Sequence, residues 1–174
     1  MSRSGYSDDC DGAELALWRG AVNSAIRGKR GQALLRETLA ALDAMPVKEL
    51  IAHELIADGA FCTLGVVGQA RGVDLAALDP EDREAVAKAF DIAPALAAEI
   101  VYENDESFCD FELVQVEICG PMRPWDYQYQ RNTHSRYLRV PKVDAAAKRW
   151  KYMRDWVAKN IQPAALTTPT ESTS

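Results

Sequence analysis

The apolar periodicity of residues 14–45 constrains the fold more than any other feature of this sequence. Gly28 is suited to ending a first amphipathic helix and Gly31 to opening a second. The four residues Gly-Lys-Arg-Gly would then form a solvent-exposed corner that presents Lys29 and Arg30. The apolar side chains recur at the three- and four-residue steps of a helix with one buried face: Leu15, Trp18, Val22, Ile26, Leu35, Leu39 and Leu42.

The same corner resembles the GXXG loop with which KH domains clamp a nucleic-acid backbone. A KH module also needs a strand before its first helix, and residues 1–12 have no strand pattern. We therefore interpret the two glycines as the closure of a helix hairpin. A basic corner that binds phosphate without being a KH loop is the alternative.

Length and composition predict one domain, residues 1–162, followed by a disordered Thr/Ser/Pro-rich tail, residues 163–174. A chain of 174 residues is long enough to bury a core without disulfides or metal. It has no uncharged apolar run of eighteen residues and no apolar stretch of a signal peptide near its start. We therefore expect no membrane partner and a protein that stays in the cytoplasm where it is made.

The sequence lacks the common signatures of metal sites and catalytic sites. Its four cysteines form no C-x-x-C pair and have no histidine at ligand spacing, so we expect free thiols, no metal and no cofactor. It also has no phosphate-binding G-x-x-x-x-G-K-[ST] motif and no nucleophile elbow. These patterns predict a protein that is not an enzyme.

Charge is distributed unevenly along the chain. Residues 1–120 hold 10 basic and 22 acidic side chains, a net charge of −12, whereas residues 121–159 hold 10 basic and 3 acidic side chains, a net charge of +7. Such asymmetry indicates a charged partner. The alternative is that the two parts neutralise each other within one fold.

Four further helices are expected before the strands. One would span Val47–Asp58 and bury Val47, Leu50, Ile51 and Leu55, and the next would span Phe61–Arg71 with Gly65 and Gly68 allowing close helix packing. A third would begin with Asp79 as its cap and Pro80 at its first position and run to Phe90, and a fourth would begin at Pro94. The last two have the outline of a helix-turn-helix, but the second offers acids where DNA reading needs Arg, Lys, Asn or Gln. We interpret them as a packing unit.

After Glu106 the apolar period changes to two, which predicts a small antiparallel sheet inserted at residues 107–142. We expect a strand over Phe111–Ile118 and a hairpin that joins 127–131 to 136–140. A final helix, capped by Asp144, would return to the core through Ala146, Trp150, Met153, Val157 and Ile161. The predicted fold class is mainly α, a helical domain of about six helices with a small β insertion (α+β).

Several blocks in order carry a resemblance: MSRSGYSDDCDG, WRGAVNSAIRGKRGQALLRE, LAALDAMP, ARGVDLAALDPEDREAVAKAFDI, AAEIVYENDE and RWKYMRDWVAKNI. Together they resemble a group of small uncharacterised proteins encoded by tailed bacteriophages and prophages, over residues 1–106 and 145–161. The resemblance implies a phage product in the cytoplasm of the bacterial host and implies no activity. Residues 107–142 depart from the pattern of the group, in which a short link joins the acidic block to the Trp-containing helix. The insertion is therefore where we expect a function specific to this protein.

The insertion combines aromatic and basic side chains, which suit either a protein interface or stacking on single-stranded bases. Alternation along the strand puts Tyr127, Tyr129 and Arg131 on one face.

Our first hypothesis is non-catalytic binding to a host protein, for host takeover or as an anti-defence inhibitor. The alternative is single-stranded nucleic-acid binding through the same face and the Gly-Lys-Arg-Gly corner. A third interpretation is that the tyrosines pack on the body and the arginines pair with its acids. The predicted binding residues are Lys29, Arg30, Arg123, Trp125, Tyr127, Tyr129, Arg131, Arg136, Tyr137 and Arg139, with Lys142 beside them.

Overall fold

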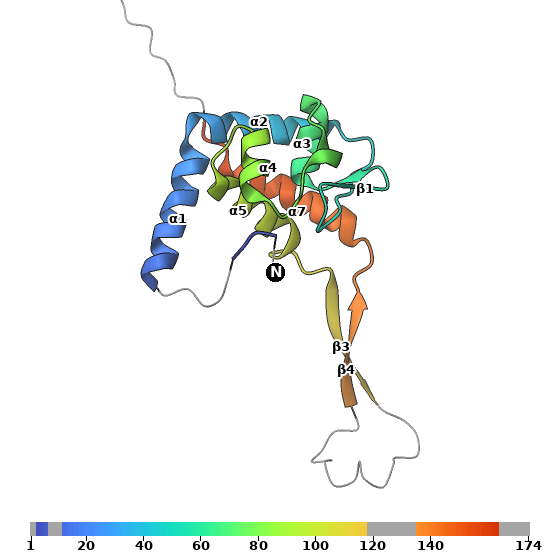
Figure 1. The fold of residues 1–174 in the computed structure, drawn as a ribbon. Helices are drawn as coiled ribbons and strands as arrows, with labels where there is room; N and C mark the ends of the chain where they lie inside the picture. The colour runs from blue at the N-terminus through green and yellow to red at the C-terminus, as the bar shows by residue number, and fades with distance from the viewer. Residues whose placement is uncertain (1–2, 7–11, 118–134, 164–174) are drawn as a thin grey trace, which may run out of the picture.

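Two long helices at the start of the chain frame the fold (Figure 1). The structure is a computed structural model and describes residues 3–6, 12–117 and 135–163. Helix α1 spans Gly12–Arg27 and helix α2 spans Lys29–Ala44. The amphipathic pattern thus correctly predicted two helices in this region.

The corner between α1 and α2 is tighter than the sequence predicted. Only Gly28 separates the helices, so Lys29, Arg30 and Gly31 belong to the first turn of α2 and not to a four-residue corner. A Cβ atom on Gly31 would lie 2.0 Å from the carbonyl oxygen of Ala25. Glycine at this position therefore allows α2 to start directly against the end of α1.

The predicted buried face of α1 is used only in part. Val22 and Ile26 are buried, as expected, but Leu15 is 52% exposed. The N-terminal half of α1 extends beyond α2 (Figure 1), where fewer elements are available to cover it. On α2, by contrast, Leu35 and Leu42 are completely buried.

The helix predicted for residues 47–58 is wrong. This segment is irregular and ends in a short hairpin formed by β1 (Ile56–Ala57) and β2 (Ala60–Phe61). Its main chain bonds to distant residues instead of to itself: Leu50 N donates to Ala146 O at 3.1 Å and Ile51 N donates to Phe61 O at 3.0 Å. Leu50 is buried as predicted, but Val47 is 59% exposed. Tertiary hydrogen bonds have replaced the i to i−4 ladder that the apolar spacing suggested.

Helix α3 spans Thr63–Arg71 and ends at Gly72 in the left-handed region, close to the predicted limits. The predicted role of its two glycines in close packing agrees with the structure. A Cβ on Gly65 would lie 1.9 Å from Leu55 O, and a Cβ on Gly68 would lie 2.9 Å from Cζ of Phe90. Helix α3 therefore packs directly on the main chain of the irregular segment.

The next two helices form a packed pair. After the 3₁₀ turn η1 (Leu75–Ala77), α4 spans Arg83–Ala89 and α5 spans Pro94–Asp105. The start of α4 differs from the prediction, because Asp82 accepts a hydrogen bond from Ala85 N at 3.0 Å and is the cap, whereas Asp79 accepts one from Glu81 N within the preceding turn. Helix α5 begins at Pro94 as predicted, and residues 95–101 are all buried.

The remaining elements are strands β3 (Phe111–Glu117) and β4 (Ser135–Pro141) and helix α7 (Ala145–Asn160). Helix α7 packs along α2 and buries Met153 and Val157, as predicted. Asp144 precedes α7 with a φ of 60°, and its side chain makes no capping hydrogen bond, contrary to the prediction. The predicted mainly helical fold with a small antiparallel sheet is confirmed.

None of the helices in the described ranges is both long enough and apolar enough to cross a membrane.

Candidate interaction sites

Strands β3 and β4 form a two-stranded antiparallel arm that extends away from the helical body (Figure 1). In its register, Phe111 lies opposite Pro141, Leu113 opposite Arg139 and Gln115 opposite Tyr137. Alternating β-branched residues favour this pairing because both strands fit a pleated surface. The predicted pairing partner of β4, residues 127–131, lies outside the described residues.

Both faces of the arm carry apolar side chains. On the first face, Leu113 is 61% exposed, Tyr137 is 67% exposed, and the Arg139 guanidinium carbon lies 4.2 Å from the centroid of the Phe111 ring. This cation–π contact holds the Arg139 guanidinium over the Phe111 ring. The register places four aliphatic residues on the second face: Val114, Val116, Leu138 and Val140. We call the first face the basic-aromatic face.

The base of the arm is fixed to α7. Lys142 N donates to Asp110 O at 2.7 Å, which closes the end of the hairpin. The buried Arg149 guanidinium pairs with the Asp110 carboxylate and lies over the Phe108 ring, with 5.4 Å from its carbon to the ring centroid. The arm therefore has a defined root on the helical body.

The structure brings together part of the predicted set of binding residues. Tyr137 and Arg139 share the basic-aromatic face, and Arg136 lies opposite Val116 in the register. Lys142 lies at the base, with its Nζ atom 5.7 Å from the Phe108 ring centroid. The other predicted residues of the insertion lie outside the described residues: Arg123, Trp125, Tyr127, Tyr129 and Arg131.

The Lys29–Arg30 corner is separate from the arm. The α1–α2 junction and the arm lie at opposite ends of the body (Figure 1). Both basic residues are exposed, as predicted, but Arg30 Nη1 lies 2.9 Å from Asp91 Oδ1. Their positions in the first turn of a helix also differ from a GXXG loop. The corner and the arm therefore do not form one continuous surface.

Much of the basic charge of the C-terminal part is neutralised within the fold. On α7, Arg149 pairs with Asp110 and Arg154 Nε lies 2.6 Å from Asp43 Oδ1. Lys151 pairs with Asp155 on the same helix at 2.7 Å. The charge asymmetry of the sequence thus reflects, at least for α7, ion pairs between and within its own elements.

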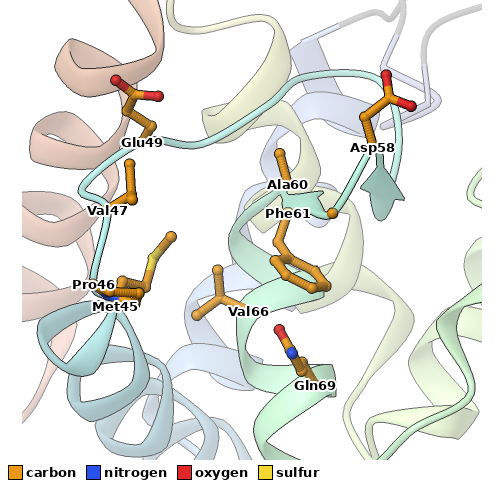
Figure 2. Close-up of a pocket in the computed structure, with 10 residues that line it drawn as sticks. Met45, Pro46, Val47, Glu49, Asp58, Ala60, Phe61, Val66 and Gln69 are labelled. Carbon is orange, nitrogen blue, oxygen red and sulfur yellow. The ribbon is translucent and has the colours of Figure 1, made fainter.

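A pocket of about 420 Å³ lies between the end of α2, the irregular segment and α3 (Figure 2). Apolar side chains dominate its lining, including Met45, Val47, Phe61 and Val66. Glu49 and Asp58 lie on opposite sides of its rim, with their carboxylates directed away from the apolar side chains (Figure 2). No sequence motif pointed to this pocket, because it depends on the irregular path of residues 46–61.

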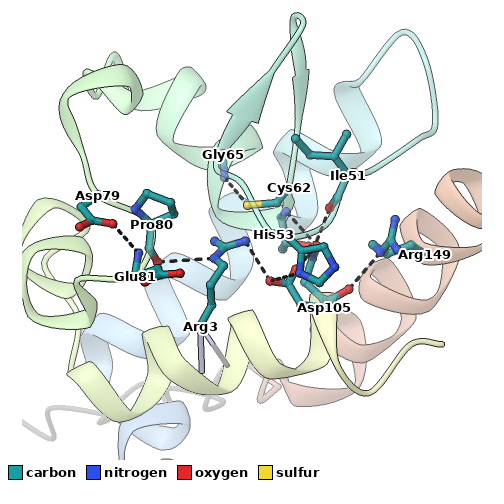
Figure 3. Close-up of polar contacts among 12 residues, drawn as sticks. Arg3, Ile51, His53, Cys62, Gly65, Asp79, Pro80, Glu81, Asp105 and Arg149 are labelled. Atoms are coloured by element: carbon teal, nitrogen blue, oxygen red, sulfur yellow. Dashed lines mark hydrogen bonds and ion pairs between the residues drawn. The ribbon is translucent and has the colours of Figure 1, made fainter. Parts of the chain in front are cut away.

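A buried polar cluster surrounds the end of α5 (Figure 3). Arg3 Nη1 lies 2.9 Å from Asp105 Oδ2, and both side chains are almost completely buried. Asn104 Oδ1 accepts hydrogen bonds from the Thr63 main-chain N and from its hydroxyl. Asn104 Nδ2 donates to Ile51 O at 2.9 Å. The cluster ties the N-terminal segment, the irregular segment and α3 to α5.

Next to this cluster lie a thiol and an imidazole. His53 Nδ1 is 3.9 Å from Asp105 Oδ2, and the Cys62 sulfur accepts a hydrogen bond from Gly65 N at 3.4 Å. Cys, His and Asp are the residue types of a nucleophilic site. Burial, however, raises the pKa of the Cys62 thiol above its ordinary value, so the reactive thiolate is disfavoured. We interpret Cys62 as a structural thiol.

A second polar cluster joins the N-terminal segment to α1 and α5. The Tyr6 hydroxyl donates to the Glu99 carboxylate, and Arg19 Nη1 donates to Glu99 Oε1 at 2.6 Å. The Tyr6 ring packs edge-on against Trp18, with 5.3 Å between the ring centroids. Burial, and then the hydrogen bond to Glu99, raise the pKa of Tyr6. This cluster holds residues 3–6 on the body.

Comparisons with protein families, with curated proteins and with solved structures found no match. In the described part of the chain, no group of three or more His, Cys, Asp or Glu side chains is arranged to hold a metal ion.

Proposed function

We propose that this protein acts without catalysis, by docking its β3–β4 arm onto a partner protein. The observation that supports the proposal is the exposure of large apolar side chains on an arm that leaves the helical body. A two-stranded hairpin is only marginally stable by itself in water. Clustered apolar exposure is typical of interaction sites, so a partner would bury what the body leaves uncovered.

The residue types on the basic-aromatic face favour a protein as the partner. Tyrosine and arginine are enriched among the residues that dominate interface energies. The Phe111 ring already orders the Arg139 guanidinium, which lowers the entropy lost on binding. The net charge of −12 on residues 1–120 would repel a long polyanion.

We further propose that the partner is a protein of a bacterial host and that the chain is a phage-encoded accessory protein of the host cytoplasm. The basis is the resemblance of its helical blocks to phage and prophage proteins. Host takeover and inhibition of host defence are the roles such binding would serve.

The proposal is tested by capture from a bacterial lysate that has been treated with nuclease. We expect the tagged protein to retain a host protein, and the variant Leu113→Ser/Tyr137→Ser to lose it. Leu17→Ser is the matched control, because Leu17 is 77% exposed and lies on α1, a helix that is not part of the arm. Equal retention by the arm variant would overturn the proposal.

Single-stranded nucleic acid is the second candidate, because the exposed Tyr137 ring and the stacked Arg139 guanidinium are groups on which bases stack. Fluorescence anisotropy with labelled single-stranded and duplex oligonucleotides at about 0.15 M salt tests it. Sub-micromolar binding that is lost in Arg139→Ala would reverse our preference. Such binding should also weaken steeply as salt rises, because phosphate contacts release counterions.

A further inference from the structure

We propose that the pocket between α2 and α3 is a second docking site, which takes a bulky apolar side chain flanked by Lys or Arg on a partner polypeptide. The pocket shares no residue with the arm. Its volume of about 420 Å³ falls within the range of sites that hold small ligands or side chains.

The walls of the pocket are held in place before any partner arrives. Two hydrogen bonds close the irregular segment on itself, from Ile51 N to Phe61 O at 3.0 Å and from Cys62 N to Leu55 O at 3.2 Å. Gly65 allows α3 to lie directly against Leu55. A preformed site loses little entropy on binding, because its main chain is already ordered.

The apolar lining selects a bulky apolar group. Met45 adapts its shape to different side chains because it is unbranched and polarizable, and Phe61 supplies an aromatic wall (Figure 2). Val47 is 59% exposed at the pocket, and Ile56, the strand partner of Phe61, is 37% exposed. Apolar surface therefore continues past the pocket itself, which suits a polypeptide better than an isolated small molecule.

The charges around the pocket select a cation beside the apolar group. Among the described residues, the carboxylates of Glu49 and Asp58 have no ion pair. The nearby Lys48 points elsewhere, since its Nζ donates to the carbonyl oxygens of Leu42 at 3.2 Å and Asp43 at 2.6 Å. Of the described residues that line the pocket, none is Lys or Arg. These two carboxylates are therefore available to pair with a cation of the partner.

The test compares two probes of similar length and opposite charge, acetyl-Phe-Arg-amide and acetyl-Phe-Glu-amide. Each is titrated into the ¹⁵N-labelled full-length protein to about 10 mM, the range in which fragment-sized ligands bind. We expect the arginine peptide to shift the amide signals of residues 45, 47–49 and 58–69. We expect the glutamate peptide to bind measurably more weakly, by up to about five-fold, because it lacks attraction to the two carboxylates.

Variants separate the apolar and the electrostatic contributions. Glu49→Gln/Asp58→Asn should remove the preference for the arginine peptide, and Ala60→Trp should abolish binding of both by filling the pocket. Glu84→Gln, an exposed carboxylate on α4 outside the pocket, is the matched control. Leu113→Ser/Tyr137→Ser should leave peptide binding unchanged, so failure of the arm proposal remains distinguishable from failure of this one. Equal shifts with both peptides, or none with either, would overturn the docking site.

Discussion

Arg149 Nη1 lies 2.8 Å from the carbonyl oxygen of Leu50, although 99 positions separate the two residues in sequence. The same guanidinium donates through Nε to Asn104 O at 3.0 Å and pairs with Asp110 at the base of the arm. One buried side chain on α7 thus joins the irregular segment, the end of α5 and the arm.

Arg149→Ala should destabilise the fold by about 3 kcal/mol, because it leaves buried carbonyl oxygens without donors and removes the partner of Asp110. Urea unfolding followed by circular dichroism measures the change. Lys151→Ala is the matched control on the same helix, since Lys151 forms an exposed pair with Asp155 and should cost about 0.5 kcal/mol or less. A similar loss in both variants would contradict the role assigned to Arg149.

Alanine at two of the glycines should destabilise the fold by roughly 1–3 kcal/mol each, the range for overpacking a close contact. Gly31→Ala forces a Cβ against the Ala25 carbonyl and Gly65→Ala forces one against the Leu55 carbonyl. Gly20→Ala serves as the control, because nothing lies within 4 Å of its Cβ position and the exchange should stabilise α1 by about 1 kcal/mol. Thermal unfolding of the three variants checks this order of stabilities.

The parts of the fold that the sequence predicts are those in which local pattern and tertiary packing agree. Helix α5 starts at Pro94 and helix α3 ends at Gly72, as predicted, because the backbone preferences of proline and glycine act locally. The helix predicted for residues 47–58 was wrong because local pattern and tertiary packing disagree there. Their apolar spacing fits a helix, but the partners of their main chain are Phe61 and Ala146, which periodicity does not reveal.

The candidate site was predictable only as a collection of residue types. Alternation in the sequence identifies the strands of the arm, and composition identifies Tyr137 and Arg139. The stacking of Arg139 on Phe111 depends on the register, and the burial of Arg149 depends on where α7 crosses the body. The pocket required the irregular segment, for which the sequence prediction was wrong.

Stability should fall in alkaline solution, and Tyr6 should contribute to that fall. Its pKa is raised in the folded state, so the unfolded chain releases the phenolic proton first, near pH 10. Above that pH the unfolded state binds fewer protons, and the free energy of unfolding decreases as pH rises. We compare urea unfolding at about pH 8 and pH 10.5. The free energy of unfolding should decrease less between these two pH values in Tyr6→Phe than in the unchanged protein. An equally steep decrease in the variant would contradict the assignment.

The two described cysteines should differ sharply in reactivity. Cys62 is 2% exposed and its pKa is raised by burial, whereas Cys109 is exposed. Iodoacetamide labelling of the native protein at about pH 8, near the pKa of a free thiol, should modify Cys109 and spare Cys62, as read by peptide mass spectrometry. Rapid labelling of Cys62 would instead indicate a reactive thiol and revive the hypothesis of a nucleophilic site.

Removal of the arm should leave a folded helical body if the residues at the base of the arm are retained. Lys142 N donates to Asp110 O at 2.7 Å, so these residues are adjacent and a Gly-Ser-Gly link can replace residues 111–141. Retaining Asp110 also preserves the ion pair of the buried Arg149.

We expect the shortened protein to keep its helical circular dichroism and cooperative unfolding while losing the captured partner. A matched deletion of residues 110–142 with the same link removes the Asp110 carboxylate and should unfold at lower urea, because Arg149 is then left buried without its counter-ion. An unfolded product from the first deletion would mean that the arm stabilises the body and is not only a binding appendage.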